Sequence, residues 1–326
     1  MSRLAKNFAM SAVTLGLVTA LICWLVAVRA SHSIAASQSP VLTLFDQTAQ
    51  SPTAQSQTAQ SPTVDHAFSQ PPATGPTVRV AVIGGMFFTG FWSALADRYE
   101  KQTGVHVDLV AMGPKDDIVN VFKQGKVDVI TMHASDTMIN LVANGYALDA
   151  QPWLRNDLII VGPPDDPAGI KGMTDAAAAL RKIAAAKSAF VVHSSTGSQE
   201  VLANIVEPGG IQLDAAHMTV LFDDPQRDVL KIAAAKHAYT LIGRIPFRIG
   251  RIPNAGLIVM VEGDERLRRP YLVAVTNPKW APGVHFHEAR QFAAFLRKPE
   301  TQAWIGDYGK GQLDDRPIFF PVTLPN

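Results

Sequence analysis

The stretch that decides the fold reads Asn156-Asp157-Leu158-Ile159-Ile160-Val161-Gly162-Pro163-Pro164-Asp165-Asp166-Pro167-Ala168-Gly169-Ile170-Lys171-Gly172. It contains a short apolar run followed directly by glycine and two prolines. A run of this length bounded by turn residues is typical of a β-strand. Proline cannot donate a ladder hydrogen bond, so it ends a central strand. We therefore predict a strand over 158–161 that ends in a turn.

Strands and helices alternate on both sides of this stretch. Before it, the apolar spacing predicts strands over 78–83, 105–110 and 127–132, a loop over 84–90, and helices over 91–102, 118–124 and 135–144. After it, we predict strands over 189–193, 220–222, 239–242, 257–261 and 271–276, and helices over 175–187, 199–206, 225–236, 286–296 and 299–306. Such alternation implies α/β layering. About ten strands are too many for one ordinary small sheet, which favours an α/β fold with two lobes.

The charge of the chain is low and balanced. Charged residues make up 17% of the 326 residues, against about 25% in typical soluble domains. Residues 1–30 contain three basic and no acidic side chains, and residues 31–76 contain two acidic and no basic ones. This leaves 26 basic and 26 acidic residues in 77–326, so that part is neutral. A neutral domain excludes a strongly basic nucleic-acid binder, and we expect no nucleic-acid partner.

The sequence gives no support for an enzyme. The single cysteine, Cys23, excludes an intramolecular disulfide, a CxxC pair and a thiolate zinc site. No phosphate-binding loop, dinucleotide motif or nucleophile elbow is present, and His285, His287 and Glu288 match no metal motif. A hydrolase using Ser194 or Ser195 with His193 would lack a recognisable nucleophile–base arrangement. We predict no catalytic residue, no metal and no cofactor.

The first 76 residues read as a targeting segment and a linker. A short basic start precedes Phe8–Val28, a run of 21 residues without charge or proline. This pattern predicts a signal peptide within 1–30. The run is also long enough to cross a bilayer, so an uncleaved signal anchor is the alternative. Residues 31–76 are rich in Ser, Thr, Gln and Pro, which predicts a disordered linker. Both alternatives place 77–326 in the periplasm or elsewhere outside the cytoplasm, with anchoring to the inner membrane as an option.

Small polar residues gather where predicted strands end. In open α/β sheets, ligands bind at the carboxyl ends of strands, and a helix N-terminus favours an anion. The candidate ligand-binding residues are Thr89, Ser135, Ser194, Ser195, Ser198 and Arg244. Helix capping by Ser and Thr is the competing interpretation for the hydroxyl groups. Arg244 follows a predicted strand within 229–261, a stretch with five basic residues and no acid, which predicts a local positive field.

The stretch 156–172 resembles the first hinge segment of the tungstate-binding periplasmic proteins of ABC transporters. The segments 128–134, 238–241, 261–271, 305–310 and 319–321 resemble the same family in the same order. The resemblance implies a type II periplasmic-binding-protein fold for 77–326. It implies crossovers near Val161 and Val261, with lobe one formed by 77–160 plus 262–326 and lobe two by 161–261.

The same resemblance implies a function. The chain would be an extracytoplasmic solute-binding protein that captures a small oxyanion resembling tungstate or molybdate, or an anionic metabolite, and passes it to an ABC permease. The binding loops depart from the family pattern. In the first loop only Thr89 keeps a hydroxyl group, and His193–Ser198 lacks the family's arginine. The apolar residues of 86–92 suggest a larger or partly apolar ligand, or a lost binding function. The alternative function is a membrane-tethered sensor or interaction domain with no transport role.

Overall fold

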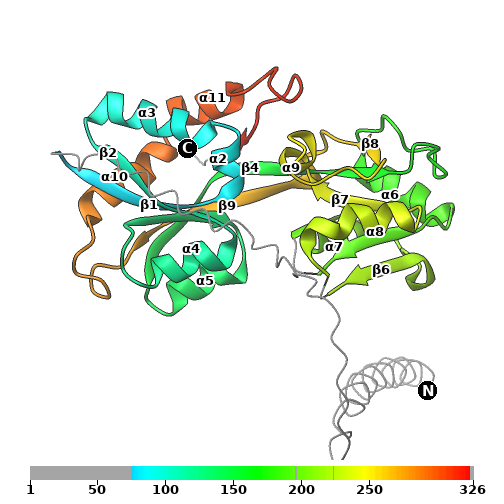
Figure 1. Ribbon diagram of the computed structural model, residues 1–326, viewed down its shortest axis with the longest axis horizontal. Coiled ribbons are helices and arrows are strands. Elements are labelled where there is room, and N and C mark those ends of the chain that lie inside the picture. Colours follow the sequence, from blue (N-terminus) through cyan, green and yellow to red (C-terminus); the bar gives the residue numbers. More distant parts are fainter. Residues whose placement is uncertain (1–74, 195–196, 223, 324–326) are drawn as a thin grey trace, which may run out of the picture. The chain divides into compact units, whose positions relative to one another are not determined.

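The computed structural model describes residues 75–194, 197–222 and 224–323 (Figure 1). The predicted signal or anchor segment, and the linker up to residue 74, lie outside these residues. Among the described residues, the structure has no helix with the length and apolar character needed to cross a membrane.

The strand β4 (Ala147–Gly162) is shared by two sheets. Residues 147–157 pair antiparallel with β9 (Arg268–Thr276). Residues 158–162 pair antiparallel with β7 (Tyr239–Gly243) and β8 (Ile258–Val261). The chain thus passes from one sheet to the other inside a single strand. The change of partners falls just before the crossover predicted near Val161, and the lobe limits themselves stay predictions.

The sequence predicted only residues 158–161 of β4. The missed part contains Asp149, which has a positive φ of 55°, and Pro152. The register with β9 shifts between Leu148 and Gln151 and again between Pro152 and Leu154. Such irregularities break the period-two pattern that identifies a strand, which explains the missed residues.

The first sheet carries helices on both faces. Its strand order is β2-β1-β3-β9-β4, with β10 beside β4, and its remaining strands are β1 (Thr77–Ile83), β2 (His106–Gly113), β3 (Val129–His133) and β10 (Phe320–Pro321). One face packs against α3 (Phe91–Thr103), α10 (Phe286–Leu296) and α11 (Pro299–Asp307). The other packs against α4 (Lys115–Phe122) and α5 (Asp136–Ala143), which lie together in Figure 1.

The second sheet is built in the same way. It continues from β4 through β7 to β5 (Phe190–His193) and β6 (Met218–Leu221), and β5 is parallel to both of its neighbours. One face packs against α6 (Ala176–Ala185) and α7 (Gly197–Val206). The other packs against α8 (Val229–Ala235). The predicted α/β architecture is therefore confirmed, with a separate core around each sheet.

Several short elements complete the chain. They are α2 (Gly84–Phe88), α9 (Arg244–Arg248) and the 3-10 turns η1 (Ala215–His217), η2 (Gln226–Asp228) and η3 (Glu265–Leu267). The prediction of a loop over 84–90 was wrong for its first five residues. Met86, Phe91 and Trp92, three of the apolar residues that suggested a larger ligand or a lost binding function, are buried in the core of the first sheet.

Gly162, at the end of β4, allows a close approach of Tyr239. A Cβ at Gly162 would overlap the Tyr239 ring, which is fully buried. The ring cannot move aside freely, because its hydroxyl group donates to Asp166 Oδ1 at 2.7 Å and accepts from the Ala168 amide at 2.9 Å. We expect Gly162→Ala to lower the free energy of unfolding by about 1–3 kcal/mol in urea denaturation.

Gly283→Ala is the matched control, because nothing lies within 4 Å of a Cβ at Gly283. We expect this change to stay within about 0.5 kcal/mol of the unaltered protein. Equal stabilities for the two variants would contradict the packing described for Gly162.

Candidate functional site

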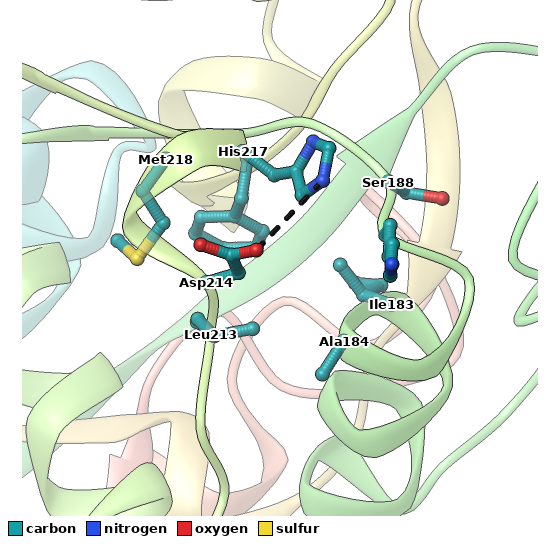
Figure 2. A pocket seen from close by; sticks show the side chains of 9 residues that line it. Ile183, Ala184, Ser188, Leu213, Asp214, His217 and Met218 are labelled. Atoms are coloured by element: carbon teal, nitrogen blue, oxygen red, sulfur yellow. Dashed lines mark ion pairs between the residues drawn. The ribbon is translucent and has the colours of Figure 1, made fainter.

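The hollow in Figure 2 is too small for a solute. It lies beside α6, η1 and β6, and has a volume of about 10 Å³. That is about the space of a single water molecule. His217 and Asp214 face one another across it at 4.0 Å, and none of the sequence-predicted site residues lines it. The binding site must be built from other groups.

The guanidinium group of Arg244 is completely buried and bonded to protein acceptors. Nε donates to Asp157 Oδ1 at 2.7 Å, and Nη1 donates to both carboxylate oxygens of Asp314 at 3.1 Å. Nη2 donates to the carbonyl oxygens of Pro317 and Ile318. All three nitrogens are therefore occupied, which leaves no donor for a ligand in this arrangement. The geometry favours a structural role for Arg244 over the ligand-binding role predicted from sequence.

Two arginines of the basic stretch 229–261, Arg244 and Arg248, pair with acidic residues outside it. Arg248 donates to Glu262 Oε2 at 2.9 Å. Burial raises the pKa of Asp314, but the hydrogen bonds from Arg316 and the attraction of Arg244 outweigh it and lower the pKa to about 2. Burial also raises the pKa of Asp157, and Arg244 offsets this only in part. The positive charges of Arg244 and Arg248 are thus balanced by acids outside the stretch.

The predicted hydroxyl donors lie at helix ends and strand ends. The Thr89 hydroxyl donates to the Met86 carbonyl oxygen at 3.2 Å. The Ser135 hydroxyl, at the N-cap of α5, donates to the His133 carbonyl oxygen at 3.3 Å. Ser194 directly follows β5, Ser198 is buried in the first turn of α7, and Ser195 lies outside the described residues.

The histidines weighed as functional groups have protein partners. His193 Nε2 donates to the carbonyl oxygen of Asp224 at 2.7 Å, so this nitrogen has no lone pair for a general base. His285 Nδ1 lies 3.0 Å from the buried carboxylate of Asp128. Within the described part of the chain, no group of three metal-ligating side chains is present.

A polar group that the sequence did not reveal lies where β4 and β9 run side by side. Asn156 and Arg269 are direct cross-strand partners. Asn156 Nδ2 lies 3.3 Å from His133 Nε2. The Arg269 guanidinium lies so close to Gly197, the first residue of α7, that a Cβ there would overlap it. These contacts connect the start of α7 to β3, and through His133 to Ser135.

The electrostatics of this group favour an anion. Burial, and then the charges of Arg269 and Lys115, hold the pKa of His133 well below its usual value, so the imidazole is neutral at pH 7. Burial also lowers the pKa of Arg269, which as an arginine keeps its charge. No residue of the described part forms an ion pair or hydrogen bond with the Arg269 side chain. Arg266 and Arg268 are also arginines, but each has an acidic partner: Arg266 pairs with Asp264, and Arg268 pairs with Glu265. Only the structure reveals this difference from Arg269.

Comparison with known proteins gives consistent matches. The sequence matches a family model described as bacterial extracellular solute-binding protein over residues 78–310. A Haloferax volcanii protein described as an ABC transporter anion-binding protein is 30% identical over 253 residues, which cover 75% of this chain and 72% of that protein. The tungstate-binding protein TupA of Peptoclostridium acidaminophilum is 28% identical over 72% of this chain and 81% of its own length.

The chain is also similar to a solved structure of a tungstate-binding protein. The tungstate-binding protein TupA from Desulfovibrio alaskensis matches with a TM-score of 0.61 and 28% identity, over 77% of this chain and 100% of the other. The resemblance inferred from the hinge segment is therefore confirmed.

Arg244 is expected to contribute strongly to stability. Replacing it by methionine leaves the carboxylate of Asp157 buried without its main partner. We expect Arg244→Met to lower the free energy of unfolding by about 3–5 kcal/mol in urea denaturation. The control is Arg248→Met, because Arg248 is 29% exposed and pairs with Glu262 near the surface. That change should cost no more than about 1 kcal/mol, and a similar loss in both variants would refute the structural role.

Proposed function

The chain belongs to the family of bacterial extracellular solute-binding proteins, and on that basis we propose that it captures a small oxyanion outside the cytoplasm and delivers it to an ABC-type permease. The relatives described as anion-binding and tungstate-binding proteins support this ligand class. The structural observation that carries it is the Arg269 guanidinium beside the start of α7. A charged guanidinium that has no acceptor among the described residues and lies next to a helix N-terminus suits an anion and disfavours a cation.

In this proposal the protein binds and releases its ligand without covalent chemistry. Thr89, Ser135, Ser194, Ser195 and Ser198 are the proposed hydroxyl donors. Closure of two lobes around the ligand by hinge motion is the movement expected of such proteins. The relatives favour transport over the alternative of a membrane-tethered sensor or interaction domain.

The ligand class can be tested by thermal unfolding of the purified protein with tungstate, molybdate, sulfate or inorganic phosphate. A ligand that binds only the folded state stabilises it by about 2.7 kcal/mol at one hundred times its Kd. For a domain of this size, we expect the bound oxyanion to raise Tm by roughly 5–10 °C. Isothermal titration calorimetry then gives the affinity. If no oxyanion changes Tm, while a neutral or cationic solute does, the proposed ligand class is wrong.

We also propose that residues 1–30 direct export, by cleavage as a signal peptide or by retention as an inner-membrane anchor. N-terminal sequencing of the exported protein distinguishes cleavage from retention of this segment. Cleavage predicts a start after residue 30 and a protein released with the periplasmic fraction. Retention predicts an intact Phe8–Val28 and recovery with membranes. Recovery of the uncleaved protein from the cytoplasm would contradict export.

A further inference from the structure

We propose that Asn156 and Arg269, neighbours on the two strands that connect the sheets, bind the anion directly, and that Arg244 does not. This inference rests on the proposed function, because it assigns residues to the same oxyanion site. It departs from the sequence-based expectation, in which Arg244 was the only charged donor.

The two residues lie on the face of β4 and β9 that meets α7. Side chains two apart in a strand share a face, so Asn156 lies on the same face of β4 as Leu158 and Ile160. Both of those residues pack in one buried cluster with Val201 and Leu202 of α7. Arg269 is directly opposite Asn156, and directly paired side chains in a sheet lie on the same face. The geometry therefore directs both polar groups toward the start of α7.

Asn156 presents a buried polar atom to this site. The residue is 8% exposed, and its Oδ1 is buried with no hydrogen-bond partner in the described part of the chain. The other end of the amide meets His133 Nε2, and which end carries the oxygen is assigned from the hydrogen-bond network. With Oδ1 accepting from the His133 N–H, the Asn156 NH₂ group faces outward as a donor. A buried polar group without a partner is unfavourable, and a bound anion would remove this cost.

Gly197 provides the space in which Arg269 reaches the helix start. A Cβ at Gly197 would overlap the Cζ, Nε and Nη2 atoms of Arg269. The first amide groups of α7 have no acceptors within the helix, so an anion here would receive backbone and guanidinium donors together. Glycine at this position is thus explained by the approach of the arginine.

The opposite face of the same two strands is occupied by structural contacts. Asp157 and Arg268 follow and precede the proposed pair in sequence, so they point away from α7. Asp157 accepts from Arg244, while Arg268 pairs with Glu265 at 2.9 Å and lies over the Phe320 ring at 4.1 Å. The pair of strands therefore separates a structural arginine cluster from a binding arginine.

The test is calorimetric titration of tungstate and inorganic phosphate into the full protein and its variants. Loss of a hydrogen bond to a charged group predicts that Arg269→Gln weakens the binding of the anion roughly 10- to 100-fold. Arg269→Lys keeps the charge without the planar fork, so we expect an intermediate loss. Arg268→Gln removes the same charge from the opposite face, and the affinity of this variant should stay within about threefold because Arg268 points away from α7 and is already paired with Glu265.

Gly197→Ala is a second, independent variant that keeps every charge. The added methyl group should displace the Arg269 side chain and weaken binding by about tenfold, while alanine in a helix preserves or raises Tm. Wild-type affinity in both Arg269→Gln and Gly197→Ala would overturn this inference and leave the proposed function standing. If the unaltered protein binds neither anion, both the inference and the oxyanion function for these probes are overturned.

Discussion

A buried arginine holds the connection between the two sheets. Arg244 has no exposed surface, and its guanidinium is bonded to Asp157 in β4 and to Asp314 and two carbonyl oxygens near the C-terminus. An isolated buried charge is very costly, so these acceptors must stay in place whenever the arginine is buried. These bonds hold residues 314–318 against β4 at the point where β4 passes from one sheet to the other. The rest of the fold depends on this arrangement, because both sheets share that strand.

The neighbouring strands β4 and β9 have paired charged groups on one face and unpaired polar groups on the other. On one face, Arg244 and its acids form a closed, neutralised cluster. On the other, no described residue bonds to Asn156 Oδ1 or forms an ion pair or hydrogen bond with the Arg269 guanidinium. Polar groups that are paired within the protein contribute to stability, whereas unpaired groups contribute free energy of binding when a ligand pairs with them. This division explains how a neutral domain presents a local site for an anion without a large basic surface.

The sequence was sufficient for the architecture and insufficient for the site. Alternating apolar runs predicted most strands and helices, because periodicity reports burial directly. The long β4 was missed where its register shifts, since a bulge breaks that periodicity. Arg244 was assigned to the ligand because its acidic partners are 87 and 70 residues away in sequence. The sequence did not single out Arg269, because Arg268 and Arg269 are the same residue type and differ only in the face of β9 on which their side chains lie.

At the proposed site the anion binds Arg269 and not Arg244. Anomalous diffraction from crystals of the protein grown with tungstate would locate the tungsten atom directly. Binding at the proposed site gives an anomalous peak within hydrogen-bonding reach of the Arg269 guanidinium and the first amides of α7, with Arg244 still bonded to Asp157. A peak beside Arg244, with the bond to Asp157 broken, would contradict it.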